Sequence, residues 1–273
     1  MSVMLFKGQP TPFRGGWKPE RKDPRDKKFG VYRLGEVGDP ATLPQSVDLR
    51  PQLDAVWNQQ DESSCTAHGG GKCARFALVK EGKDIGMPAR NFIYGQARQL
   101  EGDFNQDEGA TVRGTIKSIA QFGVPPESLF PYGPATLFLV PTSDIFAAAK
   151  RHPAINYFSI DNSQVGEMLG CLAAGYPFAF GMTLQESFMS DAVARTGFVP
   201  VPAQNEDIAG GHCMAAVGYN QAMAWPDGTT QSAIIVANSW DVTWGDNGYC
   251  YIPLSMFLDT SRTDDCWTIR TMQ

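Results

Sequence analysis

Residues 232–254 read SAIIVANSWDVTWGDNGYCYIPL, and this stretch indicates the architecture of the C-terminal half of the chain. It holds two apolar runs, 232–240 and 248–254, separated by turn-forming residues, which is a pattern typical of β-strands. The preceding turn, WPDGTT, contains the Asp-Gly pair that favours a hairpin and hence antiparallel pairing. Similar runs lie upstream at 155–160, 178–184 and 212–220. This half therefore predicts an antiparallel sheet.

The preceding part of the chain shows helical periodicity instead. In TVRGTIKSIAQFG, Val112, Ile116 and Ile119 share one helical face, and Gly123 ends the pattern. Further helices are expected at 65–80, 88–100 and 163–174. Helices followed by strands indicate an α+β fold of two lobes.

The first 44 residues differ in composition from the rest. They hold nine Lys/Arg and five Asp/Glu, a net charge of +4, whereas residues 45–273 hold fourteen and twenty-four, a net charge of −10. We therefore expect an N-terminal extension at 1–44, a helical lobe at 45–145 and a β lobe at 146–273. An acidic body lacks the clustered cations that nucleic acid requires, so no nucleic-acid partner is expected.

The overall composition is that of a globular enzyme. A chain of 273 residues, 42% hydrophobic and 19% charged, can bury a core without disulfides. No run of 18 apolar residues occurs, so neither a spanning helix nor a membrane partner is expected. The start lacks a signal-peptide pattern, so we expect synthesis in the cytoplasm, with a signal-less export route as the alternative.

The cysteines show neither a CxxC pair nor zinc-finger spacing. In a chain without a signal peptide, reduced thiols are favoured over disulfides. Cys213 follows His212 directly, but neighbouring strand residues point to opposite faces, which disfavours a shared zinc ion. We expect no metal and no cofactor. The six positions are Cys65, Cys73, Cys171, Cys213, Cys250 and Cys266.

Cys65 is the cysteine best placed to react. It is expected in the first turn of a helix, where the helix dipole and free N–H groups favour a thiolate. A lone cysteine is more often a buried structural residue. Its position alone leaves both interpretations open.

A reactive thiolate needs an imidazole partner, and the chain has three histidines. His68 lies one turn along the same helix and would leave no open face for a substrate carbonyl. His152 precedes a proline in a turn and is expected to be exposed. His212 follows two glycines and opens an apolar strand, so a rigid sheet would hold its ring with room beside it. It is the favoured base, with a hydrogen-bonded structural histidine as the alternative.

Three further residues support this pair. Asn238 would bond the distal nitrogen of His212 and fix its tautomer, and Trp240 would cover that bond from water. Gln59, six residues before Cys65, would aim its amide at a developing oxyanion together with the Cys65 backbone N–H. The candidate catalytic residues are therefore Cys65, His212, Asn238 and Gln59.

Taken together, these segments resemble papain-like cysteine peptidases. The resemblance rests on VDLRPQLDAVWNQQDESSCTA, GGHCMAAVGYN and NSWDVTWGDNGYCYIP. Cys65 and His212 are 147 residues apart, within the range of about 130–150 typical of that family. The stretch GWKPERKDPRDKKFG is similar to the N-terminal part of the bacterial branch, to which xylellain belongs.

The resemblance implies a two-lobed fold with the active site in the cleft between the lobes. The segment that begins DEGATVRG matches the family's substrate-lining strand, which points to Glu108 and Gly109. On the facing lobe, Gly210, Gly211 and Trp240 are expected to contact substrate.

Several positions depart from the family pattern. Its usual glycines are replaced by Gln60, Ser63 and Asp241, and Glu62 stands where a disulfide-forming cysteine is usual. Gly69–Gly71 lies inside the expected helix, where each glycine costs about 1 kcal/mol relative to alanine. Either a neighbour packs closely there, or the helix is irregular.

We expect a cysteine endopeptidase that acts on peptide or protein substrates through a thiolate–imidazolium pair and a thioester acyl-enzyme. An amide transferase or deamidase with the same dyad is the alternative, and a catalytically silent binding module is a third.

The cationic extension is expected to pack on the acidic body and restrict the cleft, as a propeptide does in a zymogen. Trp17 and Phe29 are its expected apolar anchors. A disordered tail that does not dock is the alternative.

Overall fold

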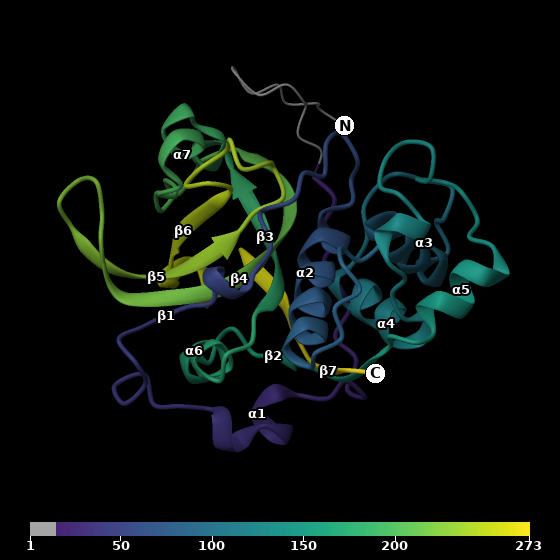
Figure 1. Cartoon of the computed structure of the whole chain (residues 1–273). Helices are drawn as coiled ribbons and strands as arrows, with labels where there is room; N and C mark the ends of the chain where they lie inside the picture. The colour runs from purple at the N-terminus through teal and green to yellow at the C-terminus, as the bar shows by residue number, and fades with distance from the viewer. Residues whose placement is uncertain (1–14) are drawn as a thin grey trace.

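A computed structural model describes residues 15–273 (Figure 1). Four helices gather on one side of the molecule, and a sheet with further short helices fills the other side. The four helices are α2 (Cys65–Lys80), α3 (Arg90–Glu101), α4 (Val112–Phe122) and α5 (Ser143–Ala149). Helix α2 runs between the other three and the sheet, so its first turn lies where the two parts meet.

The described residues form one seven-stranded antiparallel sheet in the order β2-β7-β3-β4-β5-β6, and β1 pairs with β4 off this path. The strands are β1 (Ser46–Asp48), β2 (Ala154–Ile160), β3 (Phe178–Gln185), β4 (Ile208–Ala224), β5 (Thr230–Ala237), β6 (Tyr249–Pro253) and β7 (Thr263–Met272). Strand β1 falls within the range expected for the helical lobe, yet it belongs to the sheet.

Short helices complete the structure. The α-helices are α1 (Phe29–Tyr32), α6 (Val165–Ala173), α7 (Asp191–Thr196) and α8 (Leu254–Leu258), and 3-10 turns lie at Leu34–Glu36, Arg50–Gln52, Glu127–Leu129 and Glu186–Met189. Within residues 15–273 no helix has the length and apolar character needed to cross a membrane.

The α+β fold expected from the sequence is confirmed, and the expected helices at 65–80, 88–100, 111–123 and 163–174 all form within two residues of the predicted ends. Strand β7 was not expected. The alternation of apolar and polar residues reveals a strand only when one face of that strand is polar. In β7 both faces are buried, and even Arg270 is only 5% exposed.

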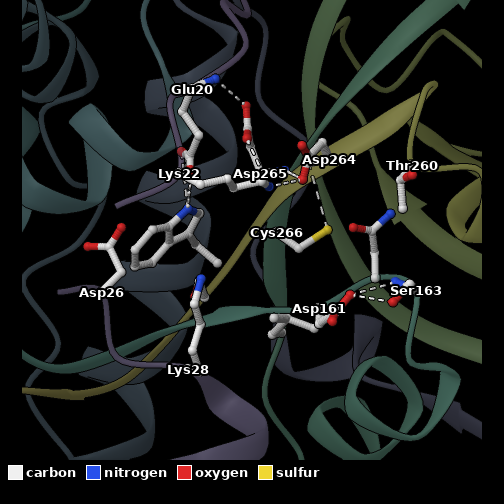
Figure 2. Close-up of a pocket in the computed structure, with 14 residues that line it drawn as sticks. Glu20, Lys22, Asp26, Lys28, Asp161, Ser163, Thr260, Asp264, Asp265 and Cys266 are labelled. Carbon is white, nitrogen blue, oxygen red and sulfur yellow. Dashed lines mark hydrogen bonds and ion pairs between the residues drawn. The ribbon is translucent and has the colours of Figure 1, made fainter. Parts of the chain in front are cut away.

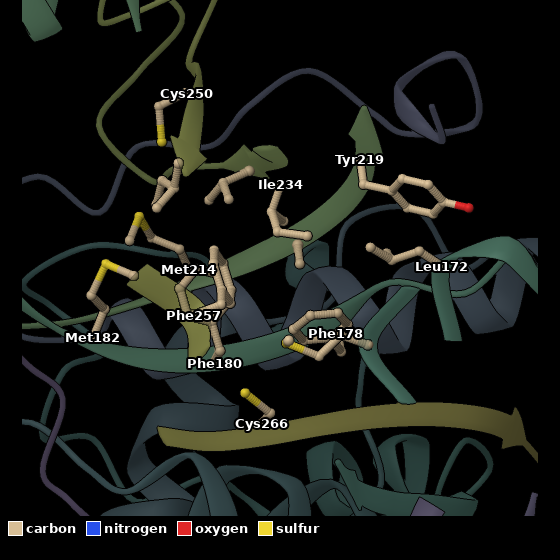
Figure 3. Packing of buried hydrophobic residues seen from close by; sticks show 14 of the residues in the cluster. Leu172, Phe178, Phe180, Met182, Met214, Tyr219, Ile234, Cys250, Phe257 and Cys266 are labelled. Carbon is tan, nitrogen blue, oxygen red and sulfur yellow. The ribbon is translucent and has the colours of Figure 1, made fainter. Parts of the chain in front are cut away.

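Aromatic side chains fill the core of the sheet (Figure 3). Phe180 and Phe257 lie 4.6 Å apart between ring centroids, and Phe178 packs edge-on against both. Met214 of β4 reaches the same cluster. This packing makes β4 a rigid support, which matters because β4 also carries His212.

Two of the three glycines of α2 are explained by close packing, and the helix is continuous. A Cβ at Gly69 would lie 2.9 Å from Cys213 Sγ, and one at Gly70 would lie 2.8 Å from Thr115 Cγ2. Both distances are shorter than ordinary van der Waals contact. The glycines therefore let α2 approach β4 and α4 closely, and this approach brings the start of α2 against His212 and its neighbours.

Candidate active site

Cys65 is the first residue of α2 and lies against β4. The backbone N–H of Cys213 donates to Cys65 Sγ at 3.4 Å. Because His212 precedes Cys213, this contact places the thiol beside the histidine's segment. The side chain of Cys65 is 0% exposed. Within residues 15–273, which include every cysteine, all six are free thiols.

His212 is oriented by Asn238. His212 Nε2 lies 2.8 Å from Asn238 Oδ1, and that oxygen also accepts the backbone N–H of Ser239 at 2.8 Å. Since a backbone N–H bonds only to an acceptor, the amide oxygen faces the ring and Nε2 carries the proton. In the neutral ring the proton acceptor is then Nδ1.

The His212–Asn238 bond is covered by aromatic rings. The Trp240 ring stacks on His212 with a centroid distance of 4.8 Å and an interplanar angle of 25°. Trp244 meets Trp240 edge-on at 5.1 Å, and Phe188 does so at 5.8 Å. A hydrogen bond in such dry surroundings is stronger than in water, so it holds the ring firmly.

Gln59 is held by hydrogen bonds at both its side chain and its backbone. Its side-chain oxygen accepts from Ser239 Oγ at 2.6 Å, and its amide nitrogen donates to the Glu62 backbone oxygen at 2.9 Å. Its backbone N–H donates to Ser239 O at 2.8 Å, and its backbone oxygen accepts from Tyr132 Oη at 2.7 Å. The second proton of the amide is not used by these bonds. Gln59 can thus donate to a reacting oxygen without losing its anchors.

The other two histidines are bound elsewhere. His68 Nδ1 lies 3.1 Å from the Ser64 backbone oxygen, and its Nε2 lies 3.0 Å from Arg90 Nη1. Arginine can only donate, so His68 accepts at Nε2 and its tautomer is fixed. His152 is partly buried rather than exposed as expected, and Nδ1 lies 3.2 Å from the Gln273 backbone oxygen. Neither arrangement suits a base for Cys65.

The described part of the expected extension crosses this region, and we call residues 15–44 the N-terminal belt. It runs between the sheet and the four helices down to α1 (Figure 1). Gly16 O accepts from Ala110 N at 2.9 Å, and Lys18 N donates to Ala110 O at 3.0 Å. On the opposite side Trp17 N approaches Gly211 O at 3.4 Å. The remaining residues of the expected extension, 1–14, lie outside the described residues.

The belt therefore contacts several residues expected to bind substrate. Gly109 has φ +88°, and a Cβ there would lie 2.0 Å from Gly16 O. The Trp17 ring packs on Gly211, since a Cβ added at Gly211 would lie 3.1 Å from Trp17 Cε3. Gly15 packs on the Gly211 backbone beside Gly210. Glu108 is exposed beside Gly109.

Both expected anchors of the belt are in contact with the body. Trp17 is partly buried, and Nε1 donates to Asp265 Oδ2 at 2.9 Å. Phe29 is 0% exposed and belongs to the main core, with the Arg270 guanidinium 5.4 Å from its ring centroid. Asp26 binds Arg113 Nε at 2.7 Å. The belt is thus an integral part of the fold.

With the belt in place, the pKa values of Cys65 and His212 are shifted in the directions that disfavour the expected thiolate–imidazolium pair. Burial raises the pKa of the Cys65 thiol to about 12, although the backbone N–H groups of Cys213 and Gly16 favour its charged form. Burial lowers the pKa of His212 to about 4, although Asn238 favours the charged ring. With the belt docked, both groups are therefore neutral.

Two departures from the family pattern keep a glycine-like backbone. Gln60 has φ +52° and Asp241 has φ +72°, in the left-handed region that favours glycine. Aspartate tolerates this region better than glutamine does. Asp241 is held by its backbone N–H to Trp57 O at 3.4 Å and by Asn58 Nδ2 at 3.3 Å. The loop geometry is therefore retained with different residues.

Sequence reasoning missed two residues of the site. Ser239 links Gln59 to Asn238, and Tyr132 links Gln59 to Ser64. The position of Ser239, between Asn238 and Trp240, was the only available signal for it. Tyr132 is 73 residues from Gln59, and nothing local indicated their contact.

Comparison with known proteins agrees with this arrangement. A sequence profile described as papain family cysteine protease matches residues 43–257. An uncharacterized peptidase C1-like protein of Acanthamoeba polyphaga mimivirus is 32% identical over 270 residues, covering 93% of this chain and 84% of that protein. Xylellain, a cysteine protease from Xylella fastidiosa, is 27% identical with a TM-score of 0.84 and full coverage of both chains. Digestive procathepsin L 3 of Tenebrio molitor shares the fold, at 16% identity and a TM-score of 0.63 over 83% of this chain and 70% of that one.

Proposed function

Because the chain belongs to the papain family of cysteine proteases, we propose that it is an endopeptidase with Cys65 as nucleophile and His212 as base. The observation that carries the proposal is the placement of Cys65 at a helix N-terminus, against the strand that holds the Asn238-oriented His212. Once the belt is displaced, solvent and the helix dipole favour the thiolate.

In the proposed mechanism the Cys65 proton moves to His212 Nδ1. The thiolate sulfur then attacks the peptide carbonyl carbon, forming a C–S bond and an oxyanion. The C–N bond breaks as Nδ1 returns its proton to the leaving amine, which leaves a thioester. Water, deprotonated by the same ring, attacks the thioester and releases the acid and the thiol. Asn238 keeps the ring oriented throughout.

Incubation with a peptide library and an E-64-type epoxide tests this proposal. Mass spectrometry should find cleaved peptides and a single adduct on Cys65. Deamidated or cross-linked peptides would indicate the transferase or deamidase alternative instead. An unlabelled Cys65 with no altered peptide, in a chain whose belt has been displaced, would indicate a silent binding module.

Gln59 supplies one of two proposed donors to the oxyanion, and the other is the Cys65 backbone N–H. Gln59→Ala is expected to lower kcat by about 10²–10³-fold, as for the loss of one oxyanion donor. KM should change little, because the donor acts mainly on the tetrahedral state. Steady-state kinetics on a small peptide substrate measures both. A kcat equal to that of the unmodified chain would disprove the assignment.

The belt is proposed to inhibit the enzyme from within the same chain. Its Gly16 backbone N–H faces the Cys65 thiol, while Gly16 O is turned toward Ala110. An N–H group is no electrophile, so the docked belt blocks the nucleophile without being cut at this residue. Peptide substrates would compete with the belt for Gly109, Ala110 and Gly211.

A further inference from the structure

Tyr132 joins the two ends of the loop that bears both proposed oxyanion donors. Its hydroxyl donates to the Gln59 backbone oxygen at 2.7 Å and lies 2.7 Å from Ser64 Oγ. Gln59 begins this loop, and Ser64 directly precedes Cys65. A single hydroxyl therefore connects the amide donor to the helix terminus that carries the N–H donor.

The ring of Tyr132 is fixed by two buried partners. The Arg90 guanidinium lies 4.1 Å from its centroid, and the His68 ring meets it edge-on at 5.2 Å and 89°. Arg90 is held in turn by an ion pair with Glu127 at 2.7 Å. This cluster gives a role to the one buried histidine that the mechanism does not use.

The loop needs such support because its backbone is strained and it has no covalent brace. The left-handed φ of Gln60 is unfavourable for a residue other than glycine. Glu62, at the position where a disulfide is usual in the family, is a buried carboxyl bonded to Asn91 Nδ2 at 3.3 Å. The separation of the two donors therefore depends on non-covalent contacts.

We propose that Tyr132 is a positioning residue for the oxyanion site. Its hydroxyl fixes the distance between the Gln59 amide and the Cys65 N–H, so both donors meet the tetrahedral intermediate without reorganisation. Tyr132 itself does not touch the substrate in this scheme. The inference rests on the proposed roles of Cys65 and Gln59.

Tyr132→Phe, which removes only the hydroxyl, tests the proposal. We expect kcat to fall by about 10–100-fold, less than or equal to the loss of Gln59, with KM nearly unchanged. A peptide aldehyde, which forms a tetrahedral adduct with the thiol, should bind more weakly by a similar factor. Alkylation of Cys65 by iodoacetamide develops no oxyanion, so its rate should be unchanged.

Tyr94→Phe is the matched control. The Tyr94 hydroxyl donates to Asp107 Oδ1 at 2.8 Å and accepts from Gly109 N at 2.9 Å, so it supports the strand expected to bind substrate. Its loss should raise KM more than it lowers kcat. An unchanged kcat in Tyr132→Phe, or turnover and alkylation falling together, would overturn the inference. Residual turnover in Cys65→Ala would instead overturn the proposed function.

A second inference comes from the point where the belt crosses β7. Glu20 N donates to Asp265 Oδ2 at 2.9 Å, and the Glu20 carboxyl accepts from Arg113 N at 2.8 Å and Trp267 Nε1 at 3.1 Å. The Asp265 side chain is fully buried and also holds Trp17. Glu20 of the belt thus contacts Asp265 of the sheet through its backbone N–H, and both side chains line a cavity of about 540 Å³ (Figure 2).

Two lysines line this cavity. Lys22 Nζ lies 3.9 Å from Asp265 Oδ1 and also binds the neighbouring Asp264, and Lys28 lines the same cavity. Arg113 and Lys117 are engaged elsewhere, since the Arg113 guanidinium binds Asp23 and Asp26 and Lys117 binds Asp26. Burial and the neighbouring Asp265 raise the pKa of Glu20 to about 8, and burial raises that of Asp265 to about 6.

The sign of the resulting pH dependence follows from proton linkage. The docked belt keeps a proton on Glu20 that the released belt loses above its ordinary pKa of 4.5, so docking weakens as pH rises toward 8. Asp23 and Asp26 do not oppose this, because bonds to arginine and lysine lower their pKa and both are ionised between pH 5 and 8 in either state. Docking also turns the proposed Cys65–His212 ion pair into a neutral pair. A proton then moves from His212 to Cys65 without being released to solvent, so this change adds no pH dependence of its own.

We infer that Glu20 and Asp265 form a pH-sensitive latch, which holds the belt on the active site in mildly acidic medium and loosens it in alkaline medium. The inference rests on the proposed inhibition by the belt. Its direction follows from the two carboxyls, which line the same cavity when the belt is docked.

The test compares the unmodified chain with Gly16→Ala, in which a Cβ would lie 2.1 Å from Ser63 O and so displace the belt. The turnover rate of Gly16→Ala is divided by that of the unmodified chain, and this ratio cancels the pH dependence of the chemistry. This ratio should fall at least about tenfold between about pH 5.5 and pH 8, since one unit of pKa shift is worth a factor of ten. With Glu20→Gln added to both chains, most of this fall should disappear, and the smaller part that Asp265 contributes should remain.

Asp23→Asn is the matched control, because it removes a belt carboxylate that is charged throughout this range. It removes an ion pair with Arg113 and so weakens docking, and it should lower the ratio by the same factor at both pH values. A ratio above one that does not change with pH, or one that falls as much after Glu20→Gln as before it, would overturn the latch. A ratio of one at every pH would overturn the proposed inhibition by the belt.

Discussion

Cys65→Ala and His212→Ala are each expected to lower peptide turnover by a factor on the order of 10⁵–10⁶, the loss seen when a unit of nucleophile and base is broken. The two losses should not add, because either change removes the same covalent step. Asn238→Ala should leave a measurable remainder, since Asn238 orients the His212 ring through one bond of 2.8 Å and does not react. Turnover of a small fluorogenic peptide measures all three variants.

Matched controls separate chemistry from folding. Cys73 lies on the same helix as Cys65, is equally buried and takes no part in the proposed mechanism, so Cys73→Ala should keep its activity. His152→Ala should also be active, because that ring contacts only the C-terminal backbone oxygen among the bonds observed. An active Cys65→Ala chain, free of contaminating protease, would remove the basis of the mechanism.

The sequence was sufficient to propose Cys65 and His212 as the candidate pair, because the chemistry restricted the choice strongly. Only three histidines were available, and only His212 combined a rigid strand with a distant amide partner. Asn238 and Gln59 followed from the needs of an imidazole and an oxyanion. The structure brings these four residues together around the start of α2, and their roles remain a prediction.

What the sequence could not predict depends on contacts between distant segments. The helix-terminal position of Cys65 suggested a lowered pKa, but burial under the belt reverses the direction. Tyr132 is far from Gln59 in the sequence, and only folding carries its hydroxyl to Gln59. Strand β7 escaped detection because burial on both faces, including that of Arg270, hides its alternation.

Gly16→Ala is expected to activate the enzyme by at least about tenfold and to make Cys65 reactive in mildly acidic medium. A Cβ at Gly16 would lie 2.1 Å from Ser63 O and 2.6 Å from Ser63 C, which are backbone atoms of the active-site loop and cannot move aside easily. The backbone of Gly16 is outside the left-handed region, so alanine adds the collision without adding conformational strain. The belt must then leave the nucleophile.

This variant is a sharper test than removing the whole extension. A chain that began at Leu43 would lose Phe29, which is fully buried in the main core, and its instability could hide any gain in rate. In Gly16→Ala the anchors further along the belt remain, including the ion pair of Asp26 with Arg113. Only the segment over Cys65 is displaced.

Gly35→Ala provides the control, because it makes the same substitution in the same belt at a position with no atom within 4 Å of the added Cβ. It should match the unmodified chain in peptide turnover and in the rate of iodoacetamide labelling at Cys65. Labelling reports exposure of the thiol independently of any substrate. When the belt leaves, water returns to Cys65 and His212, so the burial that raises one pKa and lowers the other is lost and the charged pair can form. Labelling and turnover should therefore rise together in Gly16→Ala, and equal rates in the two alanine variants would show that the belt does not control access to the nucleophile.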